Sequence, residues 1–467
     1  MKLYNTLART VQDFAPLEGN LVRFYSCGPT VYDHAHIGNL RAFIFADTLH
    51  RTLESAGFKV KHVMNITDIN DKIIARSQRD YPNDEPNEAM QKLTKYYTKV
   101  FLDDIAQIGN DTNAILFVNA TDHIDGMRQL VIDLQQKGFA YVADDGVYFS
   151  IDAYKKSGKK YGQLLTITSE NTSEARIQND EYDKATVHDF ALWKTQKPGE
   201  PAWPFMLDGR KLDGRPGWHI ECSVMSRAML GQPFDIHTGG IDLLFPHHEN
   251  EIAQSTAGND NPVMASFFAH NEHLLVDGKK MAKSASNFYT LENIIEKGYD
   301  PLAFRLLILQ SHYRSQAQFS IANLEAAQNR LQSIRAMADL QFQATGIEPW
   351  LNANTSFNAI QSEMQNDLNT PAALSILNEL TTTAEERLIS ANELETFKDT
   401  LSKLDHVFGL QLSERRDISE AQKQLIEKRE RARTDKNWAA ADELRGQLSE
   451  QSIGVRDTAH GPIWFRK

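Results

Sequence analysis

The pattern of apolar and polar residues near the N-terminus predicts a strand, a helix and a second strand. Residues 21–27 form a short run that favours β structure and is broken by glycine and proline. Apolar residues then recur at three- and four-residue spacing over 40–56, as in a helix packed on one face. Residues 58–66 partly alternate between polar and apolar. This βαβ unit predicts an α/β fold with a doubly wound parallel sheet.

The pattern of apolar and polar residues changes over residues 110–210. An amphipathic helix begins at Asp122, and a hairpin is expected around Asp145-Gly146. These features indicate an insertion that interrupts the sheet. The polar span 157–184 is expected to be loop-rich and mobile.

The sheet is expected to resume at Gly217–Cys222 and to end near residues 271–276. Beyond Asp300, leucine, isoleucine and alanine repeat at helical spacing to about residue 408. A highly charged helix and a short β-like tail complete residues 417–467.

Composition narrows the class of protein. At 467 residues the chain is long enough for several domains. With 41% hydrophobic and 24% charged residues, it has no apolar run long enough to cross a bilayer. The net charge of −12 argues against nonspecific polyanion binding but allows a local basic patch. The first residues lack the apolar stretch of a signal peptide, which predicts a cytoplasmic location.

The turn between the first strand and helix carries candidate chemistry. Backbone N–H groups at the start of a helix point outward and favour phosphate. His36 and Asn39 would place two side-chain donors there, and Gly38 would let a nucleotide approach closely. A turn with a surface histidine is the ordinary alternative, and this motif alone favours it.

Four scattered residues would together suit a tetrahedral zinc ion. His247 and Glu251 are four apart on a helix expected after a proline, so they share one face. Cys27 and Cys222, the only cysteines, would add two thiolates. Because the cysteines form no short metal motif, buried thiols acting as small hydrophobes are the alternative. The adjacent residues 248–249 (His-Glu) are spare candidates.

Three further segments carry candidate chemistry, each with an ordinary structural alternative. Lys280 and Lys283 could clamp a pyrophosphate, or belong to a common lysine-rich loop. The paired glycines between His237 and Asp242 would let a ligand approach, with the aspartate holding an ammonium group, or form a plain turn. The basic helix at 427–445 could contact nucleic acid, or be a solvated face.

Taken in order, these motifs resemble the cysteinyl-tRNA synthetases, a family of class I aminoacyl-tRNA synthetases. His36-Ile-Gly-Asn39 resembles the HIGH signature of that class. The similarity runs over essentially the whole chain, in blocks beginning at Cys27, Asn65, Gly217, Phe245, Lys280, His312, Asp367 and Trp464.

The resemblance implies an enzyme that condenses ATP and L-cysteine to cysteinyl-adenylate and passes the cysteinyl group to tRNA(Cys). It implies one Zn²⁺ held by Cys27, Cys222, His247 and Glu251, to which the substrate thiolate adds. Serine and alanine offer no soft sulfur ligand, so a second editing site would be unnecessary. ATP is expected to bind with Mg²⁺, and the enzyme to be a monomer.

The resemblance also implies roles for single residues. His36, Gly38 and Asn39 would face ATP, and Lys280 and Lys283 would stabilise the displacement. The amino-acid and adenylate pocket would be lined by Thr67, Trp218, His237 and Asp242. Anticodon bases would be contacted by Asp442 and Asp457.

The implied fold is a Rossmann-like, doubly wound parallel sheet with a connective insertion, followed by a helical bundle and a small α+β anticodon-binding domain. The expected boundaries are 1–110 and 211–300 for the two halves of the catalytic domain, 111–210 for the insertion, 301–410 for the bundle and 411–467 for the anticodon-binding domain.

Two departures from the family pattern stand out. Asn39 occupies the place of the second signature histidine, and its amide donates hydrogen bonds but carries no charge. Ala282 replaces a serine in the lysine loop and removes one hydroxyl. We expect the ATP step to be tuned rather than lost.

Two other functions compete with this one. A relative that activates cysteine for ligation to an amino-sugar compound would be shorter at the C-terminus, whereas this chain has a basic helix and a Trp464-Phe-Arg-Lys tail. A non-catalytic, zinc-stabilised nucleic-acid-binding protein should have lost His36 or the paired lysines, and this chain keeps both.

Overall fold

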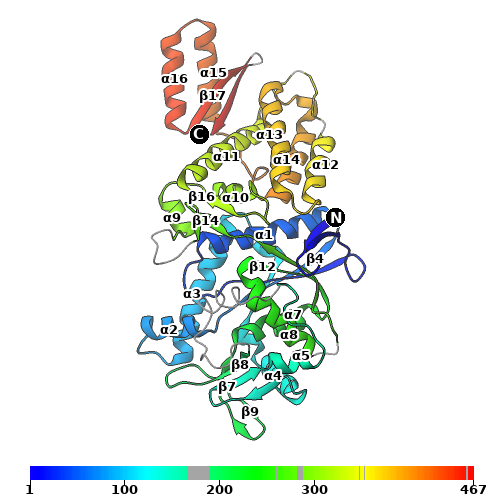
Figure 1. Cartoon of the computed structure of the whole chain (residues 1–467). Coiled ribbons are helices and arrows are strands. Elements are labelled where there is room, and N and C mark those ends of the chain that lie inside the picture. The colour runs from blue at the N-terminus through cyan, green and yellow to red at the C-terminus, as the bar shows by residue number, and fades with distance from the viewer. Residues whose placement is uncertain are drawn as a thin grey trace. The chain divides into compact units, whose positions relative to one another are not determined.

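The computed structural model describes residues 1–165, 189–258, 261–280, 288–346, 348–351, 353–458 and 461–466. They form two compact units (Figure 1). The first comprises Met1–Leu274, Lys280–Leu291 and Tyr313–Gln316, and the second comprises Leu275–Lys279, Glu292–His312 and Ala317–Lys467. The five-part division stays a prediction. Most of the span 157–184, expected to be mobile, lies outside the described residues.

A five-stranded parallel sheet forms the centre of the first unit. Its strands are, in spatial order, β13 (Ala265–Asn271), β12 (Phe234–Gly240), β3 (Leu21–Ser26), β4 (Lys59–Ile66) and β5 (Ile115–Asn119). Every neighbouring pair is parallel. The chain moves from β3 toward β5 and then returns to β12 on the other side of β3. This reversal places the ligand crevice at the carboxyl ends of β3 and β12.

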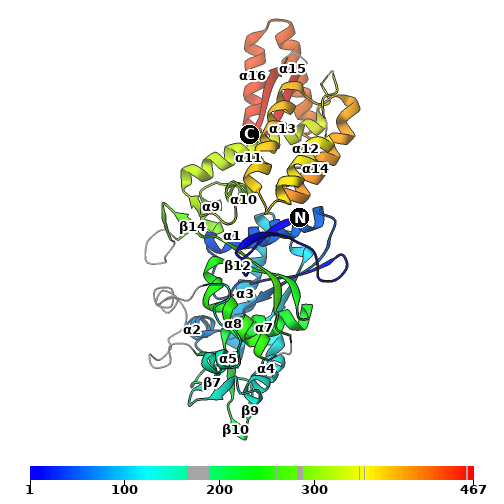
Figure 2. The same ribbon diagram turned by 45° about the vertical axis from the view of Figure 1, so that its right-hand side comes forward.

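Helices cover both faces of the sheet, which confirms the doubly wound fold expected from the sequence. Helix α1 (Ile37–Ser55) lies on one side, and α7 (Trp218–Leu230) and α8 (Glu249–Ala257) lie on the other (Figures 1 and 2). The first unit also contains β1 (Lys2–Asn5), β2 (Thr10–Asp13), α2 (Asp71–Asp80) and α3 (Pro86–Gln107).

The segment expected as an insertion forms a separate antiparallel sheet in the first unit. Its strands are, in order, β11 (Gly214–Pro216), β8 (Phe190–Thr195), β7 (Gly146–Phe149) and β6 (Ala140–Val142). The turn between β6 and β7 lies where the hairpin was expected. The accompanying elements are α4 (Ile124–Gln136), α5 (Ile151–Lys156), β9 (Met206–Leu207) and β10 (Arg210–Lys211).

One element differs from the sequence prediction. Gly217–Cys222 was expected to be a strand, but Gly217 precedes α7 and Cys222 lies within it. Eight consecutive residues of this helix, from His219 to Ser226, are buried. A helix buried on nearly all sides has no polar face, so its sequence lacks the 3.6-residue period that identifies an amphipathic helix.

The second unit is mainly helical. Its helices are α9 (Leu291–Glu296), α10 (Pro301–Leu309), α11 (Ile321–Asp339), α12 (Ala353–Met364), α13 (Thr370–Arg387), α14 (Leu394–Phe408), α15 (Glu420–Thr434) and α16 (Trp438–Glu450). A hairpin of β17 (Ile453–Thr458) and β18 (Gly461–Arg466) packs beside α16 (Figure 2). The short sheet β15–β14–β16 consists of Lys279–Lys280, Leu274–Val276 and Ala317–Phe319. In both units, none of the described helices has the length and apolarity needed to cross a bilayer.

Gly28 lets the chain after β3 approach the end of β4. Its N–H donates to Asn65 Oδ1 at 2.8 Å, and a Cβ at Gly28 would lie 1.8 Å from the Asn65 carbonyl oxygen. We expect Gly28→Ala to push these strand ends apart and to cost about 1–3 kcal/mol of stability. Thermal unfolding followed by circular dichroism measures the loss.

Gly446→Ala in α16 is the matched control, because a Cβ there meets nothing within 4 Å. A helical glycine replaced by alanine gains about 0.5–1 kcal/mol, so this variant should not unfold earlier. A Gly28→Ala protein as stable as the parent would contradict the close approach.

Candidate active site and metal centre

Cys27, Cys222, His247 and Glu251 come together at the carboxyl end of the central sheet. Cys27 directly follows β3, Cys222 lies in α7, and His247 and Glu251 flank the start of α8. One ligand atom from each lies within 4.8 Å of the others, and all four residues are buried. The two sulfurs are 4.0 Å apart, and His247 Nε2 is 3.0 Å from Glu251 Oε1. One cation at this point would meet two thiolates, an imidazole and a carboxylate.

Two more histidines face the same point. His237 in β12 places Nε2 2.8 Å from Glu251 Oε2, and His248 places Nε2 3.3 Å from Cys27 Sγ. Cys27, His237, His248 and Glu251 therefore form a second group of donors within 4.8 Å of one another. The site has more donors than a tetrahedral ion needs.

Glu249, a spare candidate in the sequence, has a different role. Its carboxylate accepts hydrogen bonds from the backbone N–H groups of residues 162–164 at 2.6–3.0 Å. The neighbouring Asn250 accepts a hydrogen bond from the hydroxyl of Tyr161. The start of α8 thus holds the segment 161–164 in place.

An outer layer of hydrogen bonds orients the inner imidazoles. His219 Nδ1 lies 2.9 Å from His247 Nδ1, and His270 Nε2 lies 2.8 Å from His248 Nδ1. His270 Nδ1 in turn contacts the hydroxyl of Thr6 at 2.9 Å. Because the Nδ1 atoms of His247 and His248 are engaged outside, their Nε2 atoms face the centre. No sequence pattern indicated this outer layer, although His219 precedes Cys222 by only three residues.

Burial and mutual contacts set the charges of these groups. Burial raises the pKa of the Cys27 thiol, whereas the hydrogen bond with Cys27 lowers the pKa of Cys222 to about 6. Burial disfavours the charged forms of His247 and Glu251, but charge interactions and hydrogen bonds with neighbouring side chains have a larger effect on the pKa of each. The carboxylate raises the pKa of His247 to about 10, and the imidazoles of His237 and His247 lower the pKa of Glu251 to about 2. A bound cation would therefore compete with protons on Cys27 and His247.

Four other predicted residues border this centre. The Trp218 ring stacks on His247 with centroids 4.2 Å apart. Thr67 donates its hydroxyl to Glu221 Oε2 at 2.9 Å, and His237 lies in β12. The exposed Asp242 follows β12, and its Oδ1 lies close to Gly240, 2.4 Å from where a Cβ on that glycine would be.

Glu221 is a site residue that the sequence analysis missed. It is almost completely buried, and burial raises the pKa of its carboxyl well above the usual range. Its Oε1 has no hydrogen-bond partner among the described residues. Glu221, Thr30 and Trp218 line one small cavity beside the metal centre. A buried carboxyl aimed into a cavity offers a polar group to a ligand there.

The turn expected to face phosphate forms the start of α1. His36 Nδ1 accepts from the Asn39 N–H at 3.1 Å, and Asn39 Oδ1 accepts from the His36 N–H at 3.4 Å. Gly38 lies between them, partly exposed. The Asn39 side chain is exposed, and its Nδ2 has no acceptor in the part of the chain that is described. One donor therefore points outward from the helix start.

The lysine loop falls mostly outside the described residues. Lys283 and Ala282 are not described, and Lys280 is described only by its backbone in β15. The described chain resumes at Phe288, whose ring packs edge-on against His36 at 5.5 Å between centroids. Phe288, just after the loop, thus lies beside the turn that is expected to face phosphate.

The two aspartates expected to contact bases differ in their surroundings. Asp457 accepts two hydrogen bonds from Arg429, at 2.7 and 2.9 Å, and pairs with Arg433 at 3.0 Å. Asp442 is exposed on α16, near the start of which Trp438 is 57% exposed. A base could reach Asp442 directly, whereas Asp457 already has two arginine partners.

Family models match nearly the whole chain. The tRNA synthetases class I (C) catalytic domain matches residues 13–329. A DALR domain matches 359–413, and a cysteinyl-tRNA ligase anticodon binding domain matches 415–464.

Curated relatives match the chain from end to end. The cysteine–tRNA ligase of Brachyspira hyodysenteriae is 39% identical, with 99% of each chain covered. That of Koribacter versatilis is 36% identical, with 100% of each chain covered. Among solved structures, Mycobacterium tuberculosis methionyl-tRNA synthetase in complex with methionyl-adenylate matches 85% of this chain and 93% of that chain, with a TM-score of 0.61 and 11% identity. This last likeness shows a shared fold.

Glu251 and Glu249 lie two residues apart on α8, but Glu251 faces the candidate metal ligands and Glu249 binds the backbone of residues 162–164. This difference allows a matched test of the candidate metal centre. We expect Glu251→Gln to lower metal affinity by more than about a hundredfold, since even losing a residue that supports a ligand costs about 10–100-fold. Glu249→Gln should keep the metal but lose about 1–3 kcal/mol of stability, because it disrupts the bonds to residues 162–164. Two measurements distinguish the variants: the metal content after dialysis, and the temperature of thermal unfolding. Equal metal loss in both variants would contradict the assignment.

Proposed function

This chain belongs to the cysteine–tRNA ligase family, and we propose that it activates L-cysteine with ATP and transfers the cysteinyl group to tRNA(Cys). The convergence of Cys27, Cys222, His247 and Glu251 at the carboxyl end of a parallel sheet carries the proposal. A donor set of this kind, next to a phosphate-facing turn, suits an enzyme that must recognise a thiol and a nucleotide together. Full-length identity of 36% and 39% to curated cysteine–tRNA ligases supports it.

The residues at the centre fit zinc. Two cysteines, a histidine and a glutamate supply a ligand mix typical of Zn²⁺, and their donor atoms already lie within 4.8 Å of one another. When bound, zinc supplies a Lewis acid with a high affinity for thiolate. His237 and His219 would keep Glu251 and His247 aimed at the ion. Serine and alanine present no sulfur to such a centre, so selection at this step would not need a second, hydrolytic site.

The remaining pocket residues would orient the amino acid. Trp218 forms a flat wall beside His247, and the exposed Asp242 carboxylate would attract the substrate ammonium group. Thr67 and Glu221 offer polar atoms at the end of β4. Holding the ammonium and the thiol at two points fixes where the substrate carboxylate lies.

ATP would lie across the start of α1. His36, Gly38 and Asn39 would face its phosphates, and Lys280 and Lys283 would neutralise the pyrophosphate with Mg²⁺. In the first step the cysteine carboxylate oxygen attacks the α-phosphorus, and the bond to the pyrophosphate oxygen breaks. In the second step a tRNA hydroxyl attacks the cysteinyl carbonyl, and AMP leaves. Charge that develops on phosphate oxygens is stabilised by these fixed donors.

The C-terminal elements would read the anticodon, with Asp442 in contact with a base and Trp438 available for stacking. Action as a monomer in the cytoplasm stays a prediction.

The outward-facing amide of Asn39 generates a specific test. Asn39→Asp replaces the outward NH₂ group by a carboxylate oxygen that repels phosphate. We expect the kcat/KM for ATP in pyrophosphate exchange to fall about a hundredfold, the usual cost of losing one such donor. The KM for cysteine should change little, because the metal centre is untouched. Asn39→His, which restores a donor, should retain most activity, and an Asn39→Asp enzyme with normal ATP kinetics would exclude this role.

The function itself is tested by ATP–pyrophosphate exchange with cysteine, with serine as the control, followed by charging of total tRNA. We expect exchange with cysteine alone and charging of a cysteine acceptor. Exchange without charging would indicate ligation to a small molecule instead, and no exchange would contradict the proposal.

A further inference from the structure

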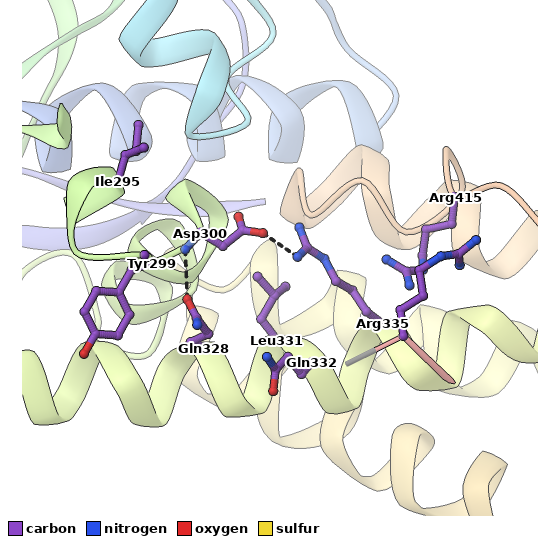
Figure 3. A pocket seen from close by; sticks show the side chains of 10 residues that line it. Ile295, Tyr299, Asp300, Gln328, Leu331, Gln332, Arg335 and Arg415 are labelled. Atoms are coloured by element: carbon purple, nitrogen blue, oxygen red, sulfur yellow. Dashed lines mark hydrogen bonds and ion pairs between the residues drawn. The ribbon is translucent and has the colours of Figure 1, made fainter. Parts of the chain in front are cut away.

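An arginine-lined pocket lies within the second unit, remote in sequence from the metal ligands (Figure 3). It has a volume of about 530 Å³. It is formed by the segment before α10, the middle of α11, Arg415 from the segment before α15, and Arg466 at the end of β18. Its polar walls are Asp300, Gln328, Gln332, Arg335, Arg415 and Arg466.

The pocket has an excess of positive charge. Asp339 is fully buried and accepts from Arg415 Nε and Nη2 at 2.7 Å each, and from Arg466 Nη1 at 2.8 Å. Asp300 accepts from Arg335 Nη1 at 2.5 Å, as Figure 3 shows. Three guanidinium groups against two carboxylates leave one net positive charge, in a chain with a net charge of −12. The buried Asp339 also fixes two of the arginines in position.

Several N–H groups on these arginines remain available. A guanidinium has five donors. Arg335 uses only Nη1, and Arg415 leaves its own Nη1 without an acceptor, as far as the described residues show. Their side chains are 22% and 13% exposed, so solvent reaches them. Such planar, prepositioned groups match the oxygens of a phosphate.

A second hollow adjoins the first and shares Gln332 and Arg466 with it. It has a volume of about 550 Å³ and is also lined by Trp464, Phe465 and Arg456. Arg456 forms an ion pair at 3.0 Å with Glu385 of the same wall, so this hollow adds no further net charge. The side chain of Arg456 is 44% exposed. The two hollows share a wall and both contain arginines, and together they extend farther than a single phosphate group requires. This favours a polymeric anion over a free phosphate.

We propose that these two hollows bind the phosphate backbone of the RNA substrate, with one phosphodiester group in the pocket of Arg335 and Arg415. An RNA partner follows from the function proposed above, so the assignment rests on it. One phosphodiester carries one negative charge and neutralises the single positive excess. Contacts of this kind position an RNA without reading its sequence, and they weaken as salt rises.

The test uses variants that spare the buried carboxylate. Removing Arg415 or Arg466 would leave Asp339 short of a partner, and breaking a buried pair costs about 3–5 kcal/mol. Arg335→Gln removes the available donors, while Asp300 keeps its hydrogen bond from the Leu302 N–H at 2.8 Å. Gln332→Glu adds a negative charge to the wall that both hollows share and breaks no ion pair.

The dissociation constant of a tRNA(Cys) transcript is measured against KCl concentration for the full chain. We expect about fivefold weaker binding for Arg335→Gln, the size of one lost hydrogen bond. The slope of log K against log salt should fall by about 1, as for one lost phosphate contact. Gln332→Glu should weaken binding in the same direction. Lys398→Gln removes the same charge from α14, which lines neither hollow, and should leave the affinity unchanged.

Unchanged affinity and slope in both pocket variants would overturn the assignment. Inorganic phosphate that binds by ³¹P NMR and is lost in Arg335→Gln, with RNA affinity unaltered, would show instead a site for free phosphate. Cysteine-dependent pyrophosphate exchange by the unmodified protein needs no RNA, so it tests the proposed function separately from this site.

Discussion

The buried carboxylate of Glu251 imposes the constraint on which the rest of the first unit depends. It has no exposure to water, and an unpaired charge in such a position costs about 3–5 kcal/mol. Its partners come from separate segments: His237 from β12, His247 from the turn before α8, and Cys27 from the end of β3. These segments can meet only if the parallel strands keep their register. The same contacts therefore stabilise the fold and assemble the candidate metal centre.

The second unit is organised around a buried carboxylate in a similar way. Asp339 has no exposure to water and holds Arg415, which precedes α15, and Arg466, which ends β18. In the first unit the buried charge gathers metal ligands, whereas in the second it fixes arginines whose remaining N–H groups face solvent. Each unit thus uses one buried acid to hold other polar groups in a fixed geometry, which we propose serves a thiol in the first unit and a phosphate in the second.

Local sequence pattern was sufficient to predict β3, α1 and β4: a β-favouring run that ends at glycine and proline, apolar residues at helical spacing, and a partial alternation of polar and apolar residues. It failed for α7, in which polar residues such as His219 and Glu221 are buried together with apolar ones. The four candidate metal ligands could be named from residue type and family resemblance. The sequence could not show whether these four residues or His237 and His248 are the better metal ligands, because all six come together only in the folded chain. The contact of Thr6 with His270 joins residues 264 apart, a separation that no local pattern encodes.

The central claim is that this donor set holds a metal ion that meets the thiol of cysteine. The most direct test replaces the native metal with Co²⁺ and records the visible and near-ultraviolet spectrum as amino acids are added. A new sulfur-to-cobalt charge-transfer band with cysteine, and none with serine or alanine, is the predicted result. A spectrum that does not change with cysteine, or that changes equally with serine, would contradict selection of the substrate by its sulfur.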